Sequence, residues 1–220
     1  MNDQQRGVVI FGDVIKSREG AAASTAWLER LCTTLDLAYG SRRLAPFDFT
    51  QGDELQGLLE VGADPFLAVL QATLQAHDGP DAVPRMRWAV AAGQIDPGHG
   101  PATRRTGAAF ILARTSLEEA KHQRDGLICR IQDAHADALL DGTAPVLAAM
   151  IDGMTDRQRE VARLSLVDGL RQSEIADRLG IARATVSVSS ARGDVRNLGR
   201  LLGAVRTIWG DAIGTEESLP

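Results

Sequence analysis

Two patterns of apolar residues divide the chain into a mixed first part and a helical second part. In the first part, short β-branched apolar runs alternate with segments whose apolar residues recur at helical spacing. Strands are predicted over residues 7–15, 47–50, 54–61, 85–93 and 126–132, and helices over 25–39, 65–76, 106–122 and 134–152, the last with a break at Gly142–Pro145. This order predicts an α+β domain in which helices cover a mostly antiparallel sheet.

From about Gly153 onward the strand patterns stop and every periodic segment is helical. One helix is predicted to start after Thr155 and to end before Gly169, and another runs from about Arg183 to Arg192. We therefore predict a first domain over residues 1–153, a small all-α domain over 154–210 and a disordered tail over 211–220.

The segment from Ser173 to Val186 has the residue pattern of a helix-turn-helix. Ala176 is small enough for two helices to cross closely, and Gly180 suits the left-handed conformation that a tight turn between them needs. A small core is expected from Ile175, Leu179, Ile181 and Val186. Such a unit places its second helix in the major groove of DNA. The alternative is a helical hairpin that packs against the first domain or mediates dimerisation.

Charge along the chain permits double-stranded DNA as a partner. The whole chain has a net charge of −5, but residues 154–207 carry ten arginines and six acidic residues, a balance of +4. The residues predicted to contact DNA are Arg171, Gln172, Arg183, Ala184, Thr185, Ser187, Ser190 and Arg192.

This second part resembles a known transcription module over about 50 residues. Thr155–Glu160 carries a T-x-R-Q-R-E opening, and Glu174–Ser187 carries the pattern E-I-A-x-x-L-G-I-x-x-x-T-V-S. Both are similar to the promoter-binding fourth region of bacterial sigma factors and to related response-regulator output domains. The resemblance implies a transcriptional regulator.

Two Gly-Asp steps indicate a second candidate site in the first domain. Asp13 ends the first predicted strand, and Asp53 lies in a hairpin after Gly52. If the strand and the hairpin are neighbours, the two carboxylates can converge on Mg²⁺, and Gly12 and Gly52 let a phosphate approach the backbone. Alternatively, each aspartate only caps its own loop.

Residues 7–132 resemble the SatD family through the G-D-V-x-x-S-R opening at Gly12, the G-D-E-x-Q hairpin at Gly52 and the G-x-A-F-x-x-A-R helix at Gly107–Arg114. The layout is also similar to class III nucleotide cyclases and diguanylate cyclases. These resemblances imply a cyclase-like fold with Asp13 and Asp53 as metal ligands. They also imply nucleotide or phosphate contacts from Gly12, Lys16, Ser17, Arg18, Gly52 and Arg114.

Two departures from the cyclase pattern favour binding over catalysis. Phe49 stands where cyclases have a base-selecting lysine, and Ile111 stands where they have an asparagine. We therefore expect a transcription regulator whose first domain senses a nucleotide or a metal, or forms a homodimer. The alternative is a metal-dependent enzyme that acts on nucleoside triphosphates and is targeted by the helix-turn-helix.

The compartment follows from what the sequence lacks. No apolar run approaches the roughly 18 residues that span a bilayer, and the first residues lack a signal-peptide core. Cys32 and Cys129 are far apart and lack metal-ligand spacing, so reduced thiols are expected. We expect a cytoplasmic protein without a membrane partner.

Overall fold

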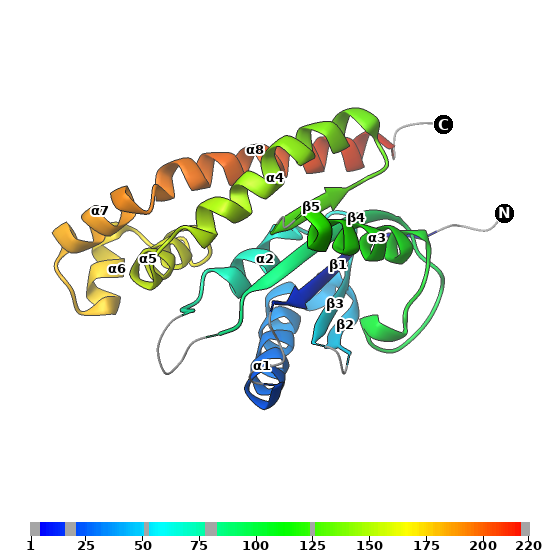
Figure 1. The fold of residues 1–220 in the computed structure, drawn as a ribbon, viewed down its shortest axis with the longest axis horizontal. Coiled ribbons are helices and arrows are strands. Elements are labelled where there is room, and N and C mark those ends of the chain that lie inside the picture. The colour runs from blue at the N-terminus through cyan, green and yellow to red at the C-terminus, as the bar shows by residue number, and fades with distance from the viewer. Residues whose placement is uncertain (1–4, 16–20, 51–52, 78–82, 124–125, 217–220) are drawn as a thin grey trace.

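A five-stranded mixed sheet forms the centre of the first domain (Figure 1). The computed structural model describes residues 5–15, 21–50, 53–77, 83–123 and 126–216. The strands are β1 (Arg6–Val14), β2 (Arg43–Phe49), β3 (Glu54–Leu59), β4 (Met86–Gln94) and β5 (Leu127–Arg130). Their order is β2-β3-β1-β4-β5, and neighbouring strands are antiparallel except β4 and β5. The predicted α+β class and mostly antiparallel sheet are confirmed.

The parallel pair β4–β5 departs from a purely antiparallel sheet because a helix, rather than a hairpin, connects the two strands. That helix covers one face of the sheet, and four other helices supply most of the helical residues in the larger core on the opposite face. The first is α3 (Ala108–Gln123), and the others are α1 (Ala21–Tyr39), α2 (Phe66–Thr73), α4 (Ala134–Asp152) and α8 (Val195–Glu216). Short 3₁₀ turns occur at η2 (Gly40–Arg42) and η3 (Ala102–Arg104).

Alternation along β1 separates the two faces. Val8 and Ile10 lie in the larger core, whereas Val9 and Phe11 pack with α3 in the smaller one. Asp13 continues the alternation of Val9 and Phe11 along β1, so it lies on the face of the sheet that α3 covers.

Helix α4 is continuous, so the predicted break at Gly142–Pro145 is wrong. Pro145 lacks the N–H for only one hydrogen bond of the helix. The buried residues on both sides of it, Leu140 and Leu147, stay on the face that packs against the larger core. This packing outweighs the local preference of proline for a helix end.

Helix α8 returns from the C-terminal helices and packs beside α4 (Figure 1). Its buried residues recur at helical spacing and share the core of the sheet: Val195, Leu198, Leu202, Val205, Trp209 and Ile213. The ring of Trp209 meets that of Phe66 edge to face, with centroids 5.8 Å apart. The predicted disordered tail is wrong over residues 211–216, because the helix continues through Glu216 and Ile213 is buried.

Three further helices lie at one end of the molecule (Figure 1). They are α5 (Asp156–Leu166), α6 (Gln172–Leu179) and α7 (Arg183–Arg192). The His77 N–H donates to Asp156 Oδ1 at 2.9 Å, and this bond joins the start of α5 to the segment after α2. Arg159, which is 1% exposed, donates to the same carboxylate at 2.9 Å and to the Asp152 carbonyl at 3.1 Å. The end of the molecule that holds α5–α7 is thus joined to the first domain by part-buried polar contacts.

Candidate functional site

The helices α5, α6 and α7 enclose a small core of their own. Its buried members are Val161, Leu164, Ile175, Ala176 and Val186, with Leu170, Leu179 and Ile181 partly buried around them. All four residues predicted from the sequence for this core are therefore in it. Because α5 and α6 both touch α7, this core determines the direction in which α7 presents its outer face.

The turn between α6 and α7 has the expected left-handed glycine. Gly180 has φ 62° and ψ 34°, and the Ile181 N–H donates to the Ala176 carbonyl at 3.1 Å. At the other end of α6, the Arg171 N–H donates to the Glu174 carboxylate at 2.7 Å. These local contacts define a short helix, a tight turn and a second helix.

Helix α7 has one buried and one exposed side. Val186 and Gly193 are buried, and a Cβ on Gly193 would stand 3.0 Å from Gln158 Cβ on α5. Of the residues predicted to contact DNA, seven are exposed: Arg171, Gln172, Arg183, Ala184, Thr185, Ser187 and Arg192. Ser190 is half-buried and lies on the side of Val186.

Val188 lies on the same helix but is not among the residues predicted to contact DNA. It is 50% exposed and lies four residues after Ala184, so both share the outer face of α7. The helical periodicity of the sequence indicates this exposure, because a residue two positions after Val186 points away from the side of the helix that Val186 buries.

The arginines of this end of the molecule fall into two groups. Arg157, Arg159 and Arg163 of α5 form ion pairs with nearby carboxylates. In contrast, Arg183 and Arg192 make no ion pair with any residue that the structure describes. The outer surface around α7 therefore has cationic side chains that are available to phosphate or to base edges.

The second candidate site centres on Asp13, and the strand register brings Glu54 directly opposite it. Helix α3 supplies a cation to each carboxylate: Lys121 Nζ lies 3.4 Å from Asp13 Oδ1, and Arg114 forms an ion pair with Glu54. Burial is the largest influence on Asp13 and raises its pKa, while Lys121 acts in the opposite direction.

Arg114 is held in place by more than its ion pair. Its guanidinium lies 4.8 Å from the centroid of the Phe11 ring, and the Glu54 carboxylate also accepts from Gln56 Nε2 at 2.8 Å. The residue predicted to contact phosphate is thus part of an internal network between α3 and the sheet.

The structure describes only part of the predicted metal and phosphate site. Lys16, Ser17, Arg18 and Gly52 lie outside the described residues. Asp53 is described, with φ 66°, and its carbonyl accepts from the Val14 N–H at 3.3 Å. Among the described residues, no group of three or more His, Cys, Asp and Glu side chains is placed to hold a metal ion.

The Mg²⁺ and nucleotide sites therefore stay predictions. So do the homodimer, the cytoplasmic location, the enzymatic alternative and the resemblance to the SatD family. Within the part of the chain that the structure covers, no helix combines the length and apolar character needed to cross a membrane.

The tight turn, the separate core and the exposed face of α7 define α5–α7 as a helix-turn-helix unit. Residues 146–193, which hold these helices and the end of α4, match the family model described as Sigma-70, region 4. The C-terminal unit is thus a helix-turn-helix similar to region 4 of sigma-70 factors, and this similarity indicates DNA binding in transcription.

One curated relative and one solved structure extend the comparison. The chain is 40% identical over 67 residues to the ECF RNA polymerase sigma factor SigK of Mycolicibacterium vanbaalenii. The match covers 30% of this chain and 34% of the sigma factor, so the chain spans about a third of that relative. A bacterial light-regulated adenylyl cyclase is similar in structure over 57% of this chain and 75% of its own, with a TM-score of 0.42 and 16% identity.

Proposed function

We propose that the protein is a regulator of transcription that binds double-stranded DNA through the outer face of α7. The observation that carries this proposal is the position of Arg183 and Arg192, which lie exposed on the second helix of a helix-turn-helix. In such units that helix enters the major groove, where arginine binds guanine edges or phosphates. The match of residues 146–193 to sigma-70 region 4 supports the same role.

The first domain is proposed to control this binding by sensing a ligand or by forming a homodimer. Helix α8 follows α7 in the chain and belongs to the core of the sheet, so the DNA-binding end is not on a flexible tether. A change of packing in the first domain can therefore alter the position of α7. A homodimer would add a second half-site and multiply sequence specificity.

The test is fluorescence anisotropy of the full-length protein on DNA from upstream of its own gene, at several salt concentrations. Replacing Arg183 by alanine is expected to weaken binding about tenfold and to change the base preference, because a groove-facing contact is lost. Arg157→Ala is the matched control, since Arg157 is paired with Glu160 and lines a pocket together with Leu74 and Gln75 of the first domain. Absence of specific binding, or equal losses in both variants, would reject the proposal.

A second series adds Mg²⁺ with ATP or GTP to the same DNA. A shift in affinity on addition of the nucleotide would support a nucleotide sensor. Unchanged affinity would leave dimerisation or another ligand as the means of control.

A further inference from the structure

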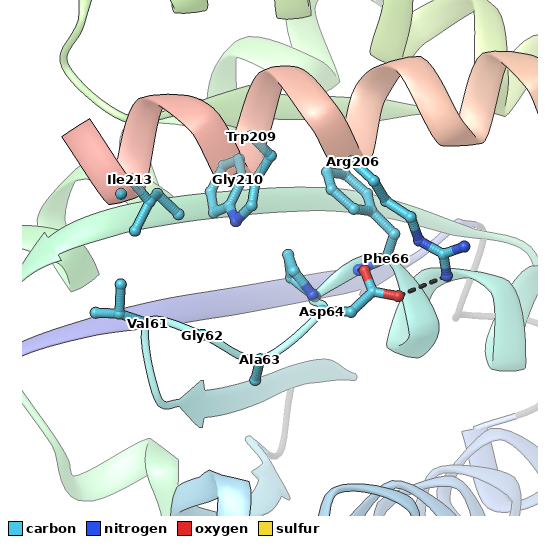
Figure 2. A pocket seen from close by; sticks show the side chains of 11 residues that line it. Val61, Gly62, Ala63, Asp64, Phe66, Arg206, Trp209, Gly210 and Ile213 are labelled. Atoms are coloured by element: carbon cyan, nitrogen blue, oxygen red, sulfur yellow. Dashed lines mark hydrogen bonds and ion pairs between the residues drawn. The ribbon is translucent and has the colours of Figure 1, made fainter.

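A cavity of about 490 Å³ lies between α8 and the loop that joins β3 to α2 (Figure 2). Its apolar walls are Val61, Phe66, Trp209 and Ile213. Gly210 of α8 also lines it, and a Cβ added there would meet no described atom within 4 Å. The cavity has the size of small-molecule sites in proteins, which are roughly 300–1,000 Å³.

The charged groups at one end of this cavity already balance each other. Arg206 Nη2 of α8 lies 2.5 Å from Asp64 Oδ2, as the dashed line in Figure 2 shows. The other carboxylate oxygen of Asp64 accepts from the Phe66 N–H at 3.0 Å, and the Asp64 carbonyl accepts from the Tyr39 hydroxyl at 2.7 Å. Because the opposite charges of Arg206 and Asp64 offset each other at this short distance, the cavity favours an uncharged ligand over an ion.

The indole N–H of Trp209 is a buried hydrogen-bond donor that is left unpaired among the described residues. The residue is 3% exposed, and its Nε1 has no hydrogen-bond partner among the residues that the structure describes. Figure 2 shows the ring projecting from α8 with its nitrogen toward the loop of Gly62 and Ala63. Buried N–H groups are nearly always paired in proteins, so an unpaired one beside a cavity indicates a position for an acceptor oxygen.

We propose that this cavity binds an uncharged, largely apolar small molecule that carries a carbonyl oxygen, and that the Trp209 N–H donates to that oxygen. The ligand would contact both the first domain and the helix that follows the DNA-binding unit. Its effect on DNA binding rests on the proposed function, whereas the binding itself does not.

The probe for the test is Prodan, an uncharged naphthalene with a propionyl and a dimethylamino group, added to the full-length protein. Transfer into an apolar site shifts its emission to the blue, and a specific site gives a saturable titration. We expect saturable binding that Gly210→Leu weakens about tenfold or more, because the leucine fills the cavity. Gly203→Leu is the matched control, since Gly203 also lies on α8 with open space at its Cβ but does not line the cavity.

The role of the indole N–H is tested with Trp209→Phe and with the same naphthalene lacking the propionyl group. Both probes lose some apolar contact with the smaller ring, but only Prodan also loses the hydrogen bond, so its affinity is expected to fall about fivefold more than that of the second probe. Binding that is not saturable, or that Gly210→Leu and Gly203→Leu weaken equally, would overturn the site. Equal losses for the two probes in Trp209→Phe would overturn the assigned hydrogen bond. Failure of DNA binding with intact Prodan binding would reject the proposed function and leave the site standing.

Discussion

Gly12 lies inside the sheet, where there is no room for a side chain. A Cβ at this position would stand 2.7 Å from both Met86 Cε and Trp88 Cζ3. The resemblance to cyclases assigns this glycine to phosphate approach, but close packing over Trp88 requires it independently of any ligand.

Replacing Gly12 by alanine is therefore expected to lower the free energy of unfolding by about 1–3 kcal/mol, because the added methyl group forces Trp88 or Met86 to move. Urea denaturation followed by circular dichroism measures this loss. Gly203→Ala serves as the control, since its Cβ meets nothing and alanine favours a helix. A Gly12→Ala protein as stable as the parent would show that the packing yields without cost.

The pKa of Asp13 predicts a pH dependence of stability. Burial raises this pKa above the ordinary value of 3.8, so the folded state binds a proton more tightly than the unfolded state does. The protonated carboxyl group contributes stability at low pH, and this contribution is lost as the pH rises through the folded-state pKa. The nearby Lys121 lowers the pKa but does not cancel the effect of burial.

Asp13→Asn removes this titration and should gain stability relative to the parent as the pH rises. We expect the difference in free energy of unfolding between variant and parent to be larger at about pH 7 than at about pH 4. Urea denaturation at both pH values measures it. A difference that decreases with pH would show that the ion pair with Lys121 outweighs the cost of burial.

At the scale of single elements, α7 combines an apolar outer face with flanking polar residues. Ala184 and Val188 occupy the centre of that face, and Ser187 and Arg192 lie beside them. In the major groove an apolar side chain of this kind contacts the methyl group of thymine.

Val188→Ala is accordingly expected to reduce the preference of the protein for thymine over uracil. In the parent, replacing a contacted thymine by deoxyuridine should weaken binding about fourfold, the equivalent of ~0.8 kcal/mol for one buried methyl group. Anisotropy on the two DNA series measures the ratio. Val146→Ala on α4 is a matched control, because both valines are 50% exposed. An unchanged ratio in Val188→Ala would place the thymine methyl elsewhere on the surface.

Local signals predicted the elements of the helix-turn-helix closely. The predicted helix from Arg183 to Arg192 is the observed α7, and Gly180 has the expected left-handed conformation. The end of α8 was missed although the signal was present, since the apolar spacing that includes Trp209 continues to Ile213. The break in α4 was wrong because burial on one face outweighs the effect of Pro145.

On the scale of the whole molecule, the first domain and α8 share one core. Leu202 is 2% exposed in the middle of α8 and belongs to the same cluster as Ile10 of β1 and Leu147 of α4. Residues far apart in sequence thus stabilise one another, and the first domain depends on a helix that follows the helix-turn-helix.

Leu202→Ala is expected to lower the free energy of unfolding of the first domain by about 2–5 kcal/mol through the cavity it leaves. Urea denaturation followed by both circular dichroism and tryptophan fluorescence should show one common transition shifted to lower urea. Leu37→Ala is the control, because Leu37 is 79% exposed. Two separate transitions in the parent, with only one shifted in the variant, would show that α8 and the sheet unfold independently.

The α+β class, the helix-turn-helix and its exposed arginines could be predicted from the sequence alone. Their signals are local: apolar spacing, a capping residue and a glycine in a turn act over a few neighbouring residues. The tertiary structure alone decided that Glu54 lies opposite Asp13, that α3 supplies cations to both, and that α8 returns to the sheet. Strand register and the packing of distant helices depend on the shape of the whole core, which no short segment encodes. For the same reason the cavity beside Trp209 could not be found from the sequence, because its walls come from segments that meet only after folding.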